Sequence, residues 1–180
     1  ALDMLFDYVR IRFPTQDVAH VAEDILRLKL SYMIHEDYGF YSYADHYFLG
    51  DIFILTSPDE EKGVLVELKG RGCRQFEAYL LAQGRSWYAF FMDCLAHEGV
   101  IKRLDLAIND RVGVLNIPLL TEKCRHEECI SVFRSFKSYR SGELVRRDEK
   151  ECMGNTLYIG SLQSDVYFCL YEKDYEQYTK

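Results

Sequence analysis

The sequence predicts an α+β fold, in which an antiparallel sheet carries helices on one face and a ferredoxin-like core is extended by additional strands. Patterned segments follow the order strand, helix, strand, strand, helix, strand, and then one helix and three strands. The 180 residues include 14 Tyr and 11 Phe, and aromatic residues are common in strands. Only 11 Gly and 3 Pro are present, too few for a flexible or collagen-like chain.

The first strand is expected at residues 5–13, where Val9, Ile11 and Phe13 alternate with polar residues. Pro14 ends this strand. Thr15 is the expected N-cap of a helix over residues 16–28, whose apolar side chains recur near the helical period.

The middle of the chain alternates between strand-like and helix-like segments. Residues 38–55 are aromatic and strand-like, with breaks at 44–45 and 50–51, and a turn is expected around Pro58 and Gly63. A strand over 64–69 precedes a long helix over about 74–97.

The last part of the chain begins with a strand over 101–110, in which Leu104, Leu106 and Ile108 form the apolar side. A helix is expected around 120–131, a mixed basic segment over 132–147, and strands over 156–161 and 165–173. No repeat, linker or low-complexity run interrupts the chain. We therefore expect a single catalytic domain over 1–180, taken as an excerpt of a longer protein because the chain starts with Ala1.

Composition excludes several classes of protein. Hydrophobic residues make up 48% of the chain, which is enough for a sizeable core and argues against disorder. No apolar run approaches the roughly 20 residues that cross a bilayer. The net charge of −7 does not point to nucleic acid, but it does not exclude nucleic acid either, because phosphate contacts need only a local basic patch.

Cysteine usage favours reduced thiols in a cytosolic protein, since the spacing is irregular and no signal peptide precedes the cysteines. The six residues are Cys73, Cys94, Cys124, Cys129, Cys152 and Cys169. The segment from Cys124 to Cys129, with His126 between them, could suggest zinc. It lacks a second CxxC or HxxxH element, so a helix with two ordinary thiols is favoured.

Two carboxylates stand out on predicted strands. Glu67 lies on the less apolar side of strand 64–69, and Asp105 lies on the less apolar side of strand 101–110. In a ferredoxin-like sheet both strands flank the first strand, about 9–10 Å apart, so the two side chains could share a divalent cation. The alternative is a solvated face on which the acids pair with nearby Arg10, Arg12, Arg103 or Lys69. Spacing alone favours this alternative.

The final strand places Tyr167, Cys169 and Tyr171 on one side. A tyrosine attacks phosphorus well only when something stabilises its phenolate or polarises the phosphate, as a metal and an arginine would. The alternative for each tyrosine is packing. Upstream, residues 133–140 repeat aromatic, basic and serine positions, which suits single-stranded DNA or an amphipathic surface.

Three motifs resemble the replication-initiation-factor family of rolling-circle plasmid initiators and MobT-type relaxases of Gram-positive integrative conjugative elements. They are LVELKGRGCRQFE at 65–77, KRLDLAIND at 102–110 and GNTLYIGSLQSDVYFCLYEKDYEQ at 154–177. The opening FDYVRIRF also resembles the first strand of that family, so the resemblance covers nearly the whole chain.

The resemblance implies a Rep/relaxase-like enzyme that nicks and joins DNA at an origin through a 5′-phosphotyrosine. It places the nucleophile on Tyr171 and the acidic metal positions on Glu67 and Asp105, with Mg²⁺ or Mn²⁺ as cofactor. The chain agrees with the family in lacking a His-x-His metal pair.

The chain departs from the family pattern in several places. An acid often follows four residues after the Asp105 position, where this chain has Asn109, so the third ligand is open between Asp7 and Glu172. Arg-Ile often precedes the nucleophile, where this chain has Cys169 and Leu170. The relaxases' N-terminal helix-turn-helix and the sheet beyond residue 180 are also absent from this sequence.

The sequence therefore predicts a metal-dependent, origin-specific DNA nickase. The basic residues expected to contact DNA are Arg10, Arg12, Arg103, Arg134, Lys137, Arg140 and Lys173. The expected partner is single-stranded or cruciform origin DNA, with a helicase and a second copy of the chain as further candidates, no membrane contact, and a cytoplasmic location. Two alternatives stay open: a non-catalytic DNA-binding module in which Tyr171 stacks on a base, and an RNA-binding ferredoxin-like domain.

Overall fold

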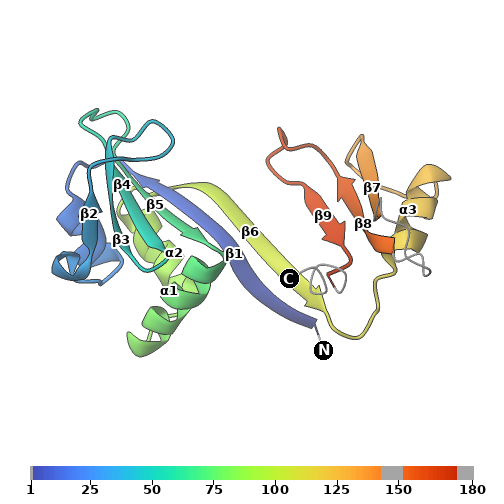
Figure 1. Ribbon diagram of the computed structural model, residues 1–180, viewed down its shortest axis with the longest axis horizontal. Helices are drawn as coiled ribbons and strands as arrows, with labels where there is room; N and C mark the ends of the chain where they lie inside the picture. Colours follow the sequence, from blue (N-terminus) through green and yellow to red (C-terminus); the bar gives the residue numbers. More distant parts are fainter. Residues whose placement is uncertain (1, 143–151, 174–180) are drawn as a thin grey trace. The chain divides into compact units, whose positions relative to one another are not determined.

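The computed structural model describes residues 2–142 and 152–173, which fall into two compact units. The N-terminal unit covers residues 2–109, and the C-terminal unit covers the described residues from Asp110 onward. Each unit contains one antiparallel sheet, and Figure 1 shows both. The α+β class with antiparallel sheets and helices is thus confirmed. The single catalytic domain stays a prediction.

The N-terminal sheet has six strands in the order β2-β3-β4-β5-β1-β6. Their bounds are β1 Leu2–Phe13, β2 Ile34–Glu36, β3 Asp45–Leu49, β4 Ile52–Thr56, β5 Val64–Lys69 and β6 Val100–Asp110. Strands β5 and β6 flank β1, as the ferredoxin-like arrangement predicted. Strands β2 and β3 extend the sheet beyond β4 and represent the additional strands.

Helices α1 (Gly70–Ala82) and α2 (Trp87–Ala96) stand where the sequence predicted one helix. Gly84 interrupts it with a φ of +65°, a left-handed conformation that glycine adopts without a steric cost. Ser86 then caps α2, because its side chain accepts a hydrogen bond from the Ala89 amide. The break folds one apolar segment into two helices.

The segment after β1 is also different from the expected helix. A π-helical turn, η1, covers His20–Ile25, and a short 3₁₀ turn, η2, covers Leu30–Tyr32. Thr15 does not cap η1, whose N-cap position is Ala19. The Asp17 Oδ1 accepts a hydrogen bond from the His20 amide. Thr15 instead accepts from the Asp17 amide and so shapes the preceding turn.

The core of the N-terminal unit lies between one face of the sheet and the helices. Val9, Ile11 and Phe13 on β1 are fully buried there, together with Phe76 of α1 and Phe90 of α2. The turn before β5 passes close to the end of β1 at Gly63, where an added Cβ would lie 2.0 Å from the Phe13 carbonyl oxygen, so only glycine fits there. On the edge strand β6, however, Leu104, Leu106 and Ile108 are exposed. Among the described residues, β6 pairs with a strand of the sheet on one side only, which is β1.

The C-terminal unit has a three-stranded sheet in the order β7-β8-β9. Strand β7 covers Phe136–Gly142, β8 covers Cys152–Ile159 and β9 covers Phe168–Tyr171. Helix α3 (Ile117–Arg125) begins earlier than predicted, because Asn116 caps it by accepting from the Leu119 amide. No helix of the described chain has the length and apolar character needed to cross a membrane.

Candidate functional site

Glu67 lies at the centre of the N-terminal sheet. Its strand β5 pairs with β1 on one side and β4 on the other, and Glu67 stands opposite Arg10 and Phe53. The residue is only 3% exposed. A charged carboxylate is costly to bury unless it is paired, so its surroundings must supply compensating groups.

Four side chains compensate the Glu67 carboxylate. The hydroxyls of Tyr8 and Tyr41 donate to its Oε1 at 2.7 Å and 3.1 Å. The Lys69 Nζ lies 3.1 Å from Oε1, and an Arg10 Nη2 lies 3.6 Å from Oε2. We call these five residues the Glu67 network.

Within the network, Tyr8 is held in its protonated form. Burial raises the pKa of Tyr8 above its ordinary value, and the hydrogen bond to Glu67 raises it further. The Tyr8 hydroxyl also accepts a hydrogen bond of 2.6 Å from Arg10. The hydrogen bond to Glu67 raises the pKa of Lys69 in turn, so Lys69 keeps its charge.

Arg103 connects Asp105 to this network. Its guanidinium lies 4.0 Å from the Tyr8 ring centroid and donates two hydrogen bonds to Asp105, of 2.9 Å and 2.7 Å. On the other side, the guanidinium of Arg10 lies 4.0 Å from the Tyr41 ring centroid. Stacking of this kind is worth about 0.5–2 kcal/mol.

Both predicted acids are therefore engaged by cations in this structure, which is the ion-paired arrangement that the sequence left open. Arg10, Lys69 and Arg103 are the partners. Arg12 is not one of them, because it donates to the main-chain carbonyls of Glu61 and Lys62 and so holds the turn between β4 and β5. The Arg10 Nε is buried without a hydrogen-bond partner among the described side chains.

The chemistry of the donor set fits a hard divalent cation. Carboxylate oxygens, which Glu67 and Asp105 carry, are ligands that Mg²⁺ and Mn²⁺ accept. The phenols of Tyr8 and Tyr41 act here as hydrogen-bond donors to Glu67. Lys69 is 64% exposed in its side chain and can leave Glu67 for solvent. Among the described residues no cluster of three His, Cys, Asp or Glu side chains suits a metal, so a third protein ligand is not evident.

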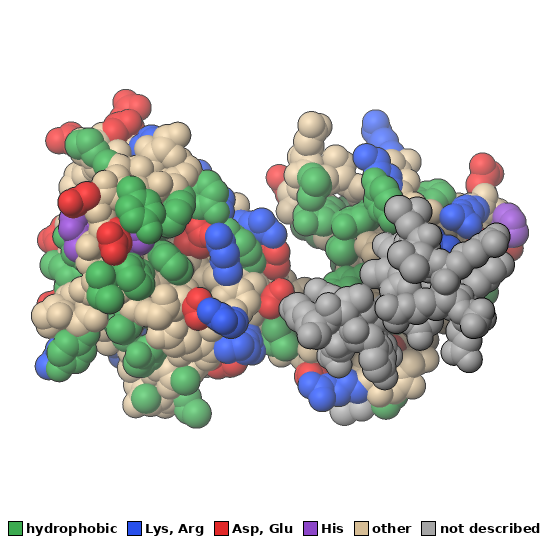
Figure 2. All heavy atoms as spheres, viewed as in Figure 1, with side chains coloured by type: hydrophobic (Ala, Val, Ile, Leu, Met, Phe, Trp, Pro, Cys, Tyr) green, Lys and Arg blue, Asp and Glu red, His purple; other side chains and the backbone are tan. Residues whose placement is uncertain are grey.

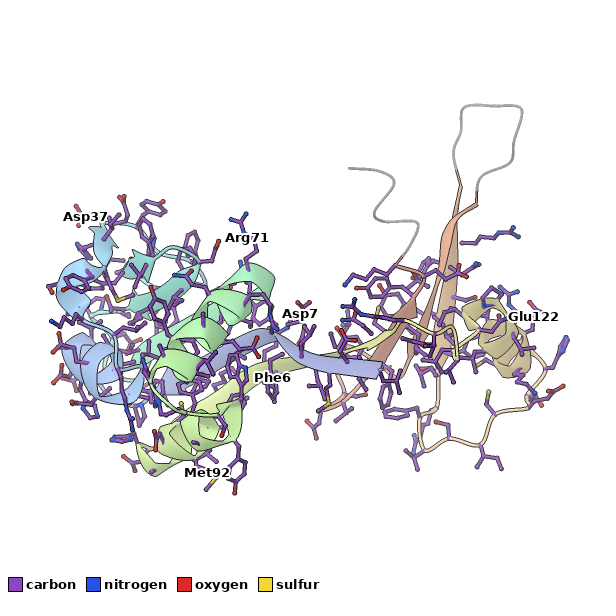
Figure 3. All side chains as sticks on the ribbon, turned by 90° about the horizontal axis from the view of Figure 1, so that it is seen from below. Phe6, Asp7, Asp37, Arg71, Met92 and Glu122 are labelled. Carbon is purple, nitrogen blue, oxygen red and sulfur yellow. The ribbon has the colours of Figure 1, made fainter. Side chains whose placement is uncertain are left out.

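The remaining candidate ligands have other contacts. Asp7 lies on β1 beside the first turn of α1, where its Oδ1 would be 3.5 Å from a Cβ placed on Gly70 (Figure 3). It is not among the side chains that contact Glu67. Asn109 donates to Asp3 at 3.4 Å, and the adjacent Asp110 accepts from three main-chain amides of the following turn. The amide of Leu115 is the main cause of the lowered pKa of Asp110.

Tyr171 ends β9 in the C-terminal unit and is 48% exposed. It stands opposite Thr156 of β8, and Cys169 stands opposite Tyr158. Tyr167 comes just before the strand. Glu172 is fixed immediately after the nucleophile candidate, because its carboxylate accepts from the Asn155 amide and side chain at 2.8 Å and 2.7 Å.

The predicted basic segment contains β7. Arg134, Lys137, Arg140 and Lys173 are all exposed. Register places Lys137 opposite Tyr158, whereas Arg140 stands opposite Asn155 and points to the other face of the sheet. On that other face α3 packs, and Arg125 donates to Ser138. The three cations of this segment therefore do not form one continuous patch.

The described cysteines are free thiols in this structure, and Cys124 and Cys129 do not share the helix that the sequence predicted. Cys124 lies in the last turn of α3 and Cys129 lies beyond the end of the helix, with 3.4 Å between the two sulfurs. Partial burial and the contact with Cys129 raise the pKa of Cys124. Within residues 2–142 and 152–173, these two thiols belong to no group of three side chains that could hold a metal ion.

Two tyrosines of the Glu67 network were missed by the sequence reasoning. Tyr8 could have been found, because it shares the polar side of β1 with Arg10. Tyr41 gave no signal, since it comes from the loop between β2 and β3 that folds back over β5. In Figure 2, basic and acidic side chains are intermixed on the visible surface of the N-terminal unit.

Comparison with known proteins gives a consistent result over the whole chain. Residues 3–93 match the family model described as the N-terminal domain of rolling circle replication initiation protein, and residues 99–180 match the model described as replication initiation factor. A curated relative from Bacillus subtilis (strain 168), named "Putative DNA relaxase NicK", is 42% identical over 177 residues. The chain spans about half of that relative, 49% of its length, and 98% of the chain itself is covered.

A solved structure is also similar. It is a rolling circle replication initiator protein from Geobacillus stearothermophilus, with a TM-score of 0.80 and 26% sequence identity. The match covers 98% of this chain and 69% of that protein. The resemblance inferred from the three sequence motifs is thus confirmed.

Proposed function

The chain belongs to the replication initiation factor family, and we propose that it nicks and rejoins one strand of DNA at an origin, for rolling-circle replication or conjugative transfer. The observation that carries this proposal is Tyr171, a half-exposed tyrosine on an antiparallel strand inside the part of the chain matched by the replication initiation factor model. The relaxase and initiator names of the relatives support the same reaction class.

The proposed reaction is a transesterification. The Tyr171 oxygen forms a bond to phosphorus, and the bond from phosphorus to the 3′ oxygen of the preceding nucleotide breaks. The phenol gives up its proton, and the departing 3′ oxygen takes one up to become a hydroxyl. The DNA keeps its 5′ phosphate on Tyr171, and attack by a 3′ hydroxyl reverses the step and rejoins the strand.

Glu67 and Asp105 are the proposed holders of Mg²⁺ or Mn²⁺, which when bound polarises the phosphate and offsets charge. Lys69 and Arg103 occupy these carboxylates and must release them first. After they leave the carboxylates, the cations Lys69 and Arg103 become available to phosphate oxygens. Arg10 stays in place beside Glu67 through its contacts with Tyr8 and Tyr41. Arg12 has a structural role already, which weakens its assignment to DNA.

The proposed partner is single-stranded or cruciform origin DNA, contacted by exposed Arg134, Lys137 and Lys173. Arg140 is exposed on the other sheet face, the side of α3, which counts against its predicted contact with this DNA. The helicase, self-association and cytoplasmic location stay predictions. The assignment of Asp7 and Glu172 as additional ligands also stays a prediction, and the hydrogen bonds from Asn155 to Glu172 count against the second.

The test is formation of a covalent adduct. The chain is incubated with Mn²⁺ and single-stranded oligonucleotides tiled across the DNA that flanks its coding sequence. A denaturing gel should show one cleaved oligonucleotide, a released 5′ fragment that ends in a 3′ hydroxyl, and a protein band shifted by the 3′-side fragment attached through its 5′ phosphate. Mass spectrometry should locate this attached fragment on Tyr171. Binding without cleavage or adduct on any oligonucleotide would favour the non-catalytic module instead.

A further inference from the structure

The sheet of the C-terminal unit has one face that carries tyrosines. Facing positions on neighbouring strands project to the same side, so register defines the members of that face. One row contains Lys137, Tyr158 and Cys169, and the next contains Tyr139, Thr156 and Tyr171. We call these six residues the tyrosine face.

The opposite face is covered from within the unit. Leu157 on the central strand is fully buried there, and Ser138 accepts a hydrogen bond from Arg125 of α3. Positions 138 and 157 face each other, one residue out of phase with the tyrosine face. Helix α3 therefore protects the side away from Tyr171.

The rings of the tyrosine face are arranged for stacking. Tyr139 is 58% exposed, and its ring centroid lies 5.9 Å from that of Tyr158 in an edge-to-face geometry. A hydrogen bond with Cys169 orients the Tyr158 hydroxyl and raises the pKa of Tyr158. The face includes one cation, Lys137, and no acid. Stacking rings beside a cation suit unpaired nucleotides.

We propose that the tyrosine face binds the unpaired DNA strand beside the scissile phosphate, with Tyr139 and Tyr158 stacking on bases and Lys137 contacting a phosphate. The inference rests on the proposed function and names its binding residues. Duplex DNA is excluded as the occupant, because paired bases offer no open ring surface to a side chain. Tyr171 shares the face, so the stacked bases would hold the strand next to the nucleophile.

The first test measures access to Cys169, whose thiol lies in the tyrosine face and is exposed. The chain carrying Tyr171→Phe is labelled briefly with N-ethylmaleimide, with and without the single-stranded oligonucleotide that the wild type cleaves, or the longest tiled oligonucleotide if none is cleaved. Mass spectrometry should show slower labelling of Cys169 with DNA. Cys129 is also exposed and lies after α3, so it is the internal control whose rate should not change.

The second test measures affinity. In the same background, Tyr139→Ala and Tyr158→Ala should each weaken single-strand binding by roughly 5- to 150-fold, the effect expected of one lost base stack. Tyr158→Phe keeps the ring and should bind within about two-fold of the parent. Tyr88→Ala on α2, at a tyrosine that is 74% exposed, is the matched control and should leave affinity unchanged.

Several results would overturn the inference. Equal protection of Cys169 by duplex DNA would show that unpaired bases are not what binds. Slower labelling at higher protein concentration without DNA would show that a second copy covers the face. If Tyr139→Ala and Tyr158→Ala both bind single-stranded DNA as tightly as their parent, these tyrosines do not stack on bases. The proposed function would still hold if the wild type forms its adduct. If the wild type forms no adduct with any oligonucleotide, the proposed function is wrong. The affinities of the tyrosine variants for single-stranded DNA would still show whether the tyrosine face binds DNA.

Discussion

The two sheets carry polar and aromatic residues in contrasting ways. In the N-terminal unit, Tyr8, Arg10 and Tyr41 satisfy a carboxylate that the sheet buries, and each group already has a protein partner. In the C-terminal unit, Tyr139 and Tyr171 stand exposed on a sheet face that α3 does not cover. The contrast indicates that one sheet holds charges in fixed positions, whereas the other offers a surface to a ligand.

The two units also differ in their cores. Buried hydrophobic side chains of the N-terminal unit come from β1, β4, β5 and the helices. Among the described residues after Asp110, only Ile117 and Leu157 are buried hydrophobic side chains. A small core supplies little hydrophobic stabilisation, so the C-terminal unit should be the less stable of the two.

The largest expected effect tests the role of the open sheet. Tyr171→Phe keeps the ring but removes the attacking oxygen, so nicking should fall by about 10⁴- to 10⁶-fold, the range seen when an enzyme loses its nucleophile. A denaturing gel measures both the nick and the adduct, and DNA binding should persist. Tyr167→Phe is the control. If the adduct persists in Tyr171→Phe and is lost in Tyr167→Phe, the nucleophile is Tyr167 and the assignment to Tyr171 is wrong.

The second prediction separates the cores. Leu157→Ala should lower the free energy of unfolding of the C-terminal unit by about 2–5 kcal/mol, because it leaves a cavity in a core with few other members. Trp87 is the only tryptophan and lies in the N-terminal unit, so its fluorescence reports that unit alone. Its urea midpoint should not move, while hydrogen exchange of the β8 amides should accelerate.

Leu68→Ala, on the fully buried side of β5, is the matched change in the other unit and should shift the Trp87 midpoint instead. If both variants change the Trp87 urea midpoint and the hydrogen exchange of the β8 amides equally, the two units unfold together. The smaller core of the C-terminal unit would then not make that unit less stable than the other.

The third prediction concerns the fixed charges. Glu67→Gln keeps the shape of the side chain but removes the charge that Lys69 and Arg10 neutralise. Mn²⁺ affinity, measured by calorimetry, should fall at least about 10-fold, as should that of Asp105→Asn. Glu77→Gln on α1 provides a control carboxylate that lies outside the network. Unchanged Mn²⁺ affinity in both network variants would remove the shared metal site.

A smaller effect should appear at alkaline pH. The raised pKa of Tyr8 favours its protonated form in the folded state, so this stabilisation is complete below pH 10 and is lost as the pH rises above it. Urea unfolding followed by Trp87 should show a steeper loss of stability above about pH 10 in the wild type than in Tyr8→Phe. Identical slopes would mean that Tyr8 titrates normally.

The smallest effect divides the basic residues by sheet face. Lys137→Ala should reduce the slope of log affinity against log salt by about 0.7, the contribution of one single-strand phosphate contact. Arg140→Ala lies on the α3 side and should leave the slope unchanged. The reverse pattern would place DNA on the side of the sheet that α3 covers.

Much of the N-terminal unit could be predicted from sequence, because alternation on β1 and β5 is local information. The placement of β5 and β6 beside β1 was predicted correctly. The burial of Glu67 was not, because its side of β5 is covered by Tyr41, from a loop 26 residues earlier in the chain. Similarly, alternation predicted an apolar side on β6, and that side is exposed on the edge strand.

In the C-terminal unit, the motif around Tyr171 allowed the last strand and the family resemblance to be predicted from the sequence. What the sequence could not provide was the register of β7 against β8, and a shift of one residue would exchange Lys137 and Arg140 between faces. The separation of the three basic residues therefore emerges only from the paired strands.

The hydrogen bonds between Glu172 and Asn155 have a mechanical consequence. A DNA end joined to Tyr171, as we propose, would transmit tension to the protein at that residue, one position before Glu172. The Asn155 amide and side chain both donate hydrogen bonds to the Glu172 carboxylate, and the Glu172 amide donates to the Asn155 carbonyl at 3.1 Å. Tension along β9 would load these bonds and the β8 ladder together, in shear. Under the proposed function, these hydrogen bonds would let the short strand β9 hold a DNA end under tension until it is rejoined.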